Sequence, residues 1–220
     1  MFRAWIHRYL DPADSLGELL FGLIMALTLT VGARILSQRP DIDPRELVVG
    51  LIGCNVAWGI IDAVLYLLGS VFSRNMRIQF VRRLRTAKGE AEAMAIIREE
   101  FDLEDEPDMS DEDRVAFYRV ILDIMKRAGT KRARLRRQDL QAAAVVILLV
   151  SLTALPGVAP FLFLEDGYLA LRLANAIQIV LMFIVGYRWA EHTGANPWRT
   201  GFAVVALGLA MVMVAVALGG

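Results

Sequence analysis

Residues 47–72 read LVVGLIGCNVAWGIIDAVLYLLGSVF, a run without lysine or arginine. A helix needs about 20 mostly apolar residues to span a bilayer, so this run is long enough to cross one. Two polar side chains interrupt it, Asn55 and Asp62. An ionised carboxylate at the centre of a bilayer costs about 2.5 kcal/mol or more, so we expect Asp62 to have a use or a partner.

The rest of the chain has the composition of a membrane protein, because 56% of its 220 residues are hydrophobic. Five apolar segments are long enough to span: Leu16–Ala33, Leu47–Phe72, Ala142–Leu164 (interrupted by Pro156 and Pro160), Tyr168–Tyr187 and Trp198–Gly220. We therefore predict an all-α, polytopic fold with five transmembrane helices. No small-residue cleavage site follows a short apolar core at the N-terminus, so the first segment is interpreted as a retained anchor.

Lysine and arginine predict the orientation, because they concentrate on the cytosolic side of a membrane. Residues 73–90 hold six basic residues and one acid, residues 126–138 are also strongly basic, and residues 155–167 hold neither lysine nor arginine. We expect the N-terminus and residues 73–138 to be cytosolic and the C-terminus external, in the cell (inner) membrane. Three parts follow: residues 1–73 with two spans, a charged cytosolic hairpin over 74–138, and residues 139–220 with three spans.

The cytosolic insert is predicted to be a hairpin of two helices. The first covers Arg74–Phe101, and the second begins at an N-cap, Ser110, and runs to about Arg137. The acidic sequence EEFDLEDEPDMSDED joins them. Its carboxylates suit divalent cations, and we name Glu99, Asp102 and Glu106 as candidate metal ligands. The alternative is a solvated acidic turn, and the basic roots also suit anionic lipid headgroups.

Polar side chains inside the spans suggest a track through the membrane. Asn55 and Asp62 are two helical turns apart and share a face, with Gly59 between them. At about 1.5 Å per residue, Met25 and Asp62 fall roughly 15 Å from the cytosolic side. The predicted metal ligands are Asp62, Met25 and Glu18, and the predicted path residues are Asn55, Gly59, Asn175 and Gln178. The alternative is a set of separate hydrogen bonds between helices, with Asp62 protonated and Arg172 reaching outward.

The sequence offers little support for an enzyme or a soluble binding module. One cysteine, Cys54, and two distant histidines, His7 and His192, exclude disulfide frameworks and Cys/His zinc sites. None of the nucleophile, phosphate-loop, zinc-protease or dinucleotide motifs occurs. We expect no tightly bound cofactor, and the net charge of zero indicates no nucleic-acid partner.

Two stretches resemble the vacuolar iron transporter (VIT-type) family: SLTALPGVAPFLFL, residues 151–164, and NPWRTGFAVVALGLAMVMVAVALGG, residues 196–220. The order of parts, two spans, a charged insert and three spans, is also similar. The resemblance implies a homodimer that exports Fe²⁺ or Mn²⁺ from the cytosol in exchange for protons. It further implies that glutamates of the insert gather the metal, which then passes between the first two helices at the dimer interface.

The sequence departs from the family pattern in its first two spans. The family's Asp-Gly pair is replaced by Met25-Ala26, and the region of its Ser-Met pair reads GIIDAVLYLLG, with Asp62 near that position. A thioether and a carboxylate still suit Fe²⁺. The alternative is a VIT-like protein without transport, whose hairpin senses metal or recruits a partner; a membrane enzyme is the weakest interpretation.

Overall fold

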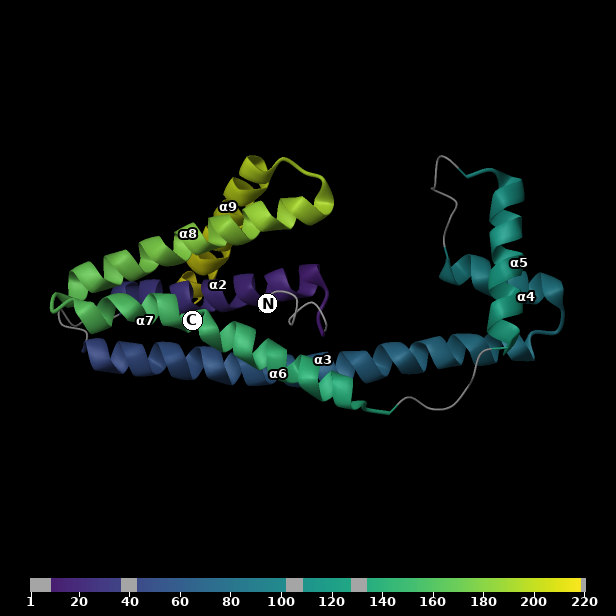
Figure 1. Cartoon of the computed structure of the whole chain (residues 1–220), viewed down its shortest axis with the longest axis horizontal. Coiled ribbons are helices and arrows are strands. Elements are labelled where there is room, and N and C mark those ends of the chain that lie inside the picture. Colours follow the sequence, from purple (N-terminus) through teal and green to yellow (C-terminus); the bar gives the residue numbers. More distant parts are fainter. Residues whose placement is uncertain (1–8, 37–42, 102–108, 128–133, 219–220) are drawn as a thin grey trace. The chain divides into compact units, whose positions relative to one another are not determined.

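The computed structural model describes residues 9–36, 43–101, 109–127 and 134–218, and these residues form helices joined by short links (Figure 1). The helices are α2 (Pro12–Leu36), α3 (Pro44–Thr86), α4 (Glu90–Glu100), α5 (Asp111–Arg127), α6 (Arg137–Leu152), α7 (Ala154–Phe163), α8 (Gly167–Thr193) and α9 (Pro197–Ala217). Five candidate spans result from α2, α3, α6 with α7, α8 and α9. The prediction of an all-α protein with five membrane spans is confirmed.

The third span is built from two helices because of its prolines. Continuing α6 through Pro156 would drive the proline ring into the carbonyl of Leu152, four residues earlier. The structure instead ends α6 at Leu152 and restarts the helix after Thr153, whose N–H donates to the Val150 carbonyl at 3.3 Å. Pro156 then lies in the first turn of α7, where its missing N–H removes no helical hydrogen bond.

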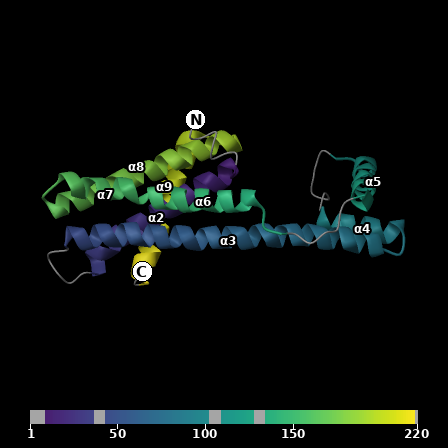
Figure 2. The same ribbon diagram turned by 60° about the horizontal axis from the view of Figure 1, so that its bottom comes forward.

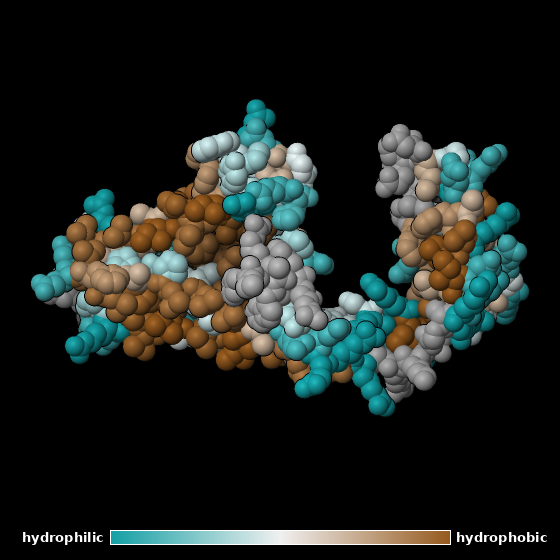
Figure 3. Space-filling view, viewed as in Figure 1, coloured by the Kyte–Doolittle hydropathy of each residue, from teal (hydrophilic) through white to brown (hydrophobic). Residues whose placement is uncertain are grey.

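The chain divides into two compact units, one of residues Met1–Leu67 with Arg137–Gly220 and one of Leu68–Arg136. In the first, the membrane unit, α2 packs against α6, α7, α8 and α9, and α3 runs beside α6 (Figures 1 and 2). A buried cluster joins α2, α8 and α9: Leu23, Leu27, Met182, Val185, Val212 and Val216. Most of the visible surface of this bundle is apolar, as a bilayer requires (Figure 3).

The second unit contains the last part of α3 with α4 and α5. Its core is apolar and aromatic: Phe80, Leu84, Ala93, Ile97, Tyr118 and Leu122. The single helix predicted over Arg74–Phe101 is wrong, because α3 runs on to Thr86 and α4 begins separately at Glu90. Gly89 precedes α4 in an extended conformation, and the N–H of Lys88 donates to Glu92 Oε2 at 2.6 Å.

The second helix of the hairpin begins as predicted and ends earlier. The N–H of Asp113 donates to Ser110 Oγ at 3.1 Å, which confirms the predicted cap. The Ser110 hydroxyl donates in turn to Asp113 Oδ2 at 2.6 Å. Helix α5 ends at Arg127 and α6 begins at Arg137, so the predicted end near Arg137 is wrong.

Candidate functional site

Glu18 on α2 and Asp62 on α3 form a carboxyl pair within the membrane spans. Their side chains are hydrogen-bonded to each other, and both residues are half-buried. Asp14, one turn before Glu18 on the same helix, adds further negative charge to it. A hydrogen bond between two carboxyl groups needs a proton on one of them, because two ionised carboxylates are both acceptors and repel each other. A pair that shares one proton has one negative charge, which suits either a second proton or a divalent cation.

The pairing gives Asp62 a different neighbour on α2 from the one that sequence spacing predicted. Sequence spacing placed Asp62 level with Met25, whereas the structure pairs it with Glu18. Met25 is a half-buried residue seven positions after Glu18, which is about 10 Å further along α2. The two helices run antiparallel, since Glu18 of α2 pairs with Asp62 of α3 whereas Gly22, later on α2, lies at Asn55, earlier on α3. The predicted ligands Glu18 and Asp62 are thus brought together, and Met25 lies nearer the level of Asn55.

Asn55 ties three helices together in the interior of the membrane unit. The side chain is 0% exposed. Its Nδ2 donates to the Gly22 carbonyl of α2 at 3.1 Å, to the Val150 carbonyl of α6 at 3.2 Å and to Thr153 Oγ1 at 2.9 Å. The Thr153 hydroxyl donates to the same Val150 carbonyl at 2.6 Å. The break between α6 and α7 thus supplies the partners of Asn55, and the lack of a side chain at Gly22 leaves room for them.

Gln178 of α8 forms a second group of buried polar atoms, one helical turn from the contacts of Asn55. Its side chain is 0% exposed and lies against Gly157 of α7, where an added Cβ would collide with the Gln178 amide and come within 3.1 Å of Leu51 Cδ2. Gly157 is one turn beyond Thr153, and Leu51 is one turn from Asn55. Among the described residues of the membrane unit, four side chains have buried atoms without a hydrogen-bond partner: Asn55 Oδ1, Ser151 Oγ, Asn175 Oδ1 and both amide atoms of Gln178.

Gly59 separates the carboxyl pair from these amides along α3. A Cβ added to Gly59 would lie 3.1 Å from the Ile147 carbonyl oxygen and 3.4 Å from Val150 Cβ. The backbone of α6 therefore packs directly on α3 at this point. The two polar regions lie on opposite sides of this tight contact.

The acidic hairpin residues are only partly described. Glu99 accepts from Arg83 Nη2 at 3.0 Å, and both side chains are exposed. Asp102 and Glu106 lie outside the described residues. Within the part of the chain that the structure describes, no three Asp, Glu, His or Cys side chains group closely enough to hold a metal ion.

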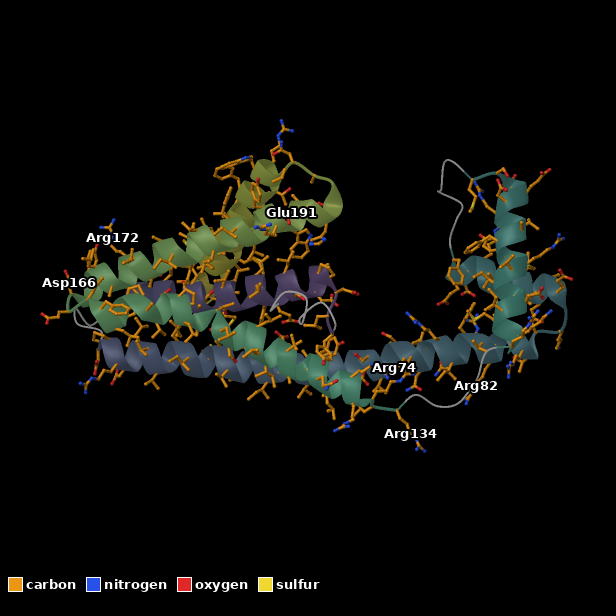
Figure 4. The ribbon with its side chains drawn as sticks, viewed as in Figure 1. Arg74, Arg82, Arg134, Asp166, Arg172 and Glu191 are labelled. Atoms are coloured by element: carbon orange, nitrogen blue, oxygen red, sulfur yellow. The ribbon has the colours of Figure 1, made fainter. Side chains whose placement is uncertain are left out.

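Charged residues mark the ends of α8. Asp166 caps its start by accepting from the N–H groups of Tyr168 and Leu169 at 2.9 and 3.2 Å. The Arg172 guanidinium lies 5.7 Å from the centre of the Tyr168 ring, near that same end, and Glu191 lies near the other (Figure 4). The Arg172 side chain is exposed.

Sequence reasoning missed Thr153, Gly157 and Leu51, which surround the buried amides. The signal for Thr153 was Pro156, since a proline forces a helix to end a few residues earlier and leaves carbonyls without donors. No sequence signal identifies Leu51, because one leucine in a long apolar run resembles the others.

Comparison with known proteins places the chain in a family. Residues 70–220, more than half of the chain, match the VIT family. The match begins within α3 and runs to the end of the chain, so Glu18, Asn55 and Asp62 lie before it. A comparison with curated proteins gives no match.

Proposed function

The chain belongs to the VIT family, and we propose that it moves Fe²⁺ or Mn²⁺ out of the cytosol across the inner membrane in exchange for protons. Members of the family transport iron and manganese. The five spans make the chain an integral membrane protein. The metal, the direction and the coupling to protons are inferred from the chemistry of the carboxyl pair and from the resemblance to the family.

The Glu18–Asp62 hydrogen bond is the observation that carries the proposal. A half-buried carboxyl pair in a span binds a proton readily, because the neutral carboxyl is easier to desolvate than the ion. When a divalent cation enters, both carboxylates ionise and the shared proton leaves. The occupied pair is then neutral, so the metal complex has less charge to move through the membrane than the bare ion.

Further ligands complete the proposed route. Two carboxylates supply at most four oxygens, and a cation such as Mn²⁺ takes about six ligands, so water and a second subunit fill the remainder. We propose a homodimer, with Met25 as a thioether ligand further along α2. Glu99, Asp102 and Glu106 gather cations at the cytosolic hairpin. Asn55, Gly59, Asn175 and Gln178 line the route beyond the carboxyl pair.

The proposed orientation puts the second unit in the cytosol. Basic residues are concentrated where α3 leaves its apolar stretch and where α6 begins: Arg74, Arg77, Arg82, Arg83, Arg85, Arg134, Arg136 and Arg137. Such clusters favour the cytosolic face, where anionic lipid headgroups attract them.

Metal uptake into proteoliposomes tests the proposal. The wild-type protein should move Mn²⁺ or Fe²⁺ with opposite movement of protons, and Asp62→Asn and Glu18→Gln should each lose both fluxes. Glu165→Gln is the matched control, since Glu165 is an exposed carboxylate between α7 and α8. Wild-type flux in Asp62→Asn would show that the pair is only a structural hydrogen bond.

A second candidate is a metal sensor or partner-recruiting scaffold that does not transport. It is favoured by the family match, which includes the hairpin and leaves out the carboxyl pair. A groove of about 440 Å³ lies between α4 and α5, with Met94, Arg98, Arg114 and Tyr118 in its lining. This candidate predicts that the full-length protein binds Mn²⁺ in equilibrium dialysis and gives no flux in liposomes.

A further inference from the structure

The buried amides beside α7 need partners that the surrounding helices do not provide. Gln178 is 0% exposed, and neither of its amide atoms has a partner among the described residues. A buried amide has the same need for hydrogen bonds as a backbone group, and a membrane interior supplies none from lipid. The groups that meet it must therefore come from protein or from ordered water.

Backbone chemistry adds an acceptor in the same layer. Pro160 lies inside α7 and has no N–H, so it cannot donate the usual helical hydrogen bond to the carbonyl of Pro156, one turn earlier. Pro156 directly precedes Gly157, which lies against Gln178. The interface of α3, α7 and α8 thus holds the unpartnered Gln178 amide, a carbonyl that Pro160 cannot bond and, one turn away, the unpartnered Asn55 Oδ1.

The mixture of donors and acceptors points to the ligand. A cation can use only Oε1 of the Gln178 amide and leaves its Nε2–H₂ group without an acceptor, whereas water both donates and accepts, and a buried water usually makes two to four hydrogen bonds. Asn175, one turn before Gln178 on α8, offers another unpartnered buried oxygen. The row from Asn55 through Gln178 to Asn175 therefore suits several waters in succession.

We propose that ordered water occupies this interface and forms a hydrated chamber, separated from the carboxyl pair by the packing of α6 on Gly59. The chamber supplies hydration to a cation that has left Glu18 and Asp62. This second step rests on the proposed transport function, and the presence of water does not.

Radiolytic hydroxyl labelling of the full-length protein in detergent tests for the water directly. Leu51 is 0% exposed yet borders the Gln178 amide, so water in the chamber should label it. Met182 is equally buried and lies against Gly208, and methionine is intrinsically more reactive to radicals, so it is the internal control. Labelled Leu51 with unlabelled Met182 supports the chamber, and unlabelled Leu51 overturns it.

Thermal unfolding of Gln178→Leu gives a second, independent test. If the amide is dry, removing an unpartnered polar group raises Tm. If it holds water, the substitution strands the remaining polar groups, lowers Tm and abolishes the labelling of Leu51. Met182→Leu, one turn further along α8, is the matched control for a change of packing. Neither measurement uses metal. If the Asp62→Asn assay contradicts the transport proposal, these two measurements therefore still test the water.

Discussion

The side chains of Glu18 and Asp62 form a hydrogen bond between two helices that cross the membrane in opposite directions. The same two helices also meet where Asn55 donates to the Gly22 carbonyl at 3.1 Å. The hydrogen bond from Asn55 to Gly22 thus fixes the two helices that carry the carboxyl pair. A fixed pair can bind a cation without first ordering two long side chains, which lowers the entropic cost of binding.

Metal affinity should depend on pH because binding releases the proton of the pair. Where the pair holds one proton, each unit of increase in pH should lower the Kd for Mn²⁺ about tenfold. Asp62→Asn removes the shared proton and should flatten this dependence, as measured by equilibrium dialysis between pH 6 and 8. Glu165→Gln should keep the wild-type slope. A slope of zero in the wild-type protein would contradict proton exchange at this site.

The acidic residues of the hairpin should affect the collection of metal and not its passage. Replacing Glu99, Asp102, Glu104 and Glu106 with their amides weakens the local attraction for cations. The KM for Mn²⁺ at the cytosolic side should rise several-fold, with Vmax unchanged, and the effect should shrink at high ionic strength. Replacing Glu165 should change neither constant. An unchanged KM would contradict a role in collecting metal and would favour the alternative, a solvated acidic turn.

The spans were predictable from the sequence because each is a long run with few charges. The break inside the third span was foreseen from its prolines, although its position at Thr153 follows from where the proline ring would collide. The helix expected over Arg74–Phe101 failed because its apolar periodicity continues across Gly89, and periodicity does not reveal where a chain turns. Tertiary contacts of Leu84, Ala93 and Ile97 decide that turn.

The sequence indicated which polar residues to consider for the candidate site but not which of them contact each other. Asp62, Glu18 and Asn55 are conspicuous because polar side chains are costly in a span. Their partners depend on the register between α2 and α3, which is set by the packing of apolar residues such as Ala26 and Leu51. A register shift of one helical turn moves a partner by about 5 Å, so counting residues from each membrane face placed Asp62 beside Met25.

Topology has a direct test with a reporter that is active only in the cytosol. Fusion after Gly89, between α3 and α4, should give activity, because basic residues surround this part of the chain. Fusion after Gly220 should give none, since five spans put the two ends of the chain on opposite sides. Immunoblotting of both fusions controls for expression. The reverse pattern would contradict both the orientation and the proposed direction of export.

The close contact at Gly22 should make this position intolerant of any side chain. A Cβ there would collide with Thr153 Oγ1 and lie 3.0 Å from the Val150 carbonyl, and overpacking of this kind typically costs about 1–3 kcal/mol. Gly22→Ala should therefore lower Tm in detergent. Gly17→Ala is the matched control on α2, because nothing lies within 4 Å of its added Cβ, and it should leave Tm unchanged or raise it.

The double variant Gly22→Ala with Thr153→Ala separates this collision from other effects. Removing the threonine hydroxyl clears the space that the new methyl group needs, while Asn55 keeps its two carbonyl acceptors, Gly22 and Val150. The double variant should lose less stability than the sum of the two single variants, with a coupling energy of about 0.5–3 kcal/mol. Additive losses would show that Gly22 and Thr153 do not touch. The antiparallel register that pairs Glu18 with Asp62 would then lose its support.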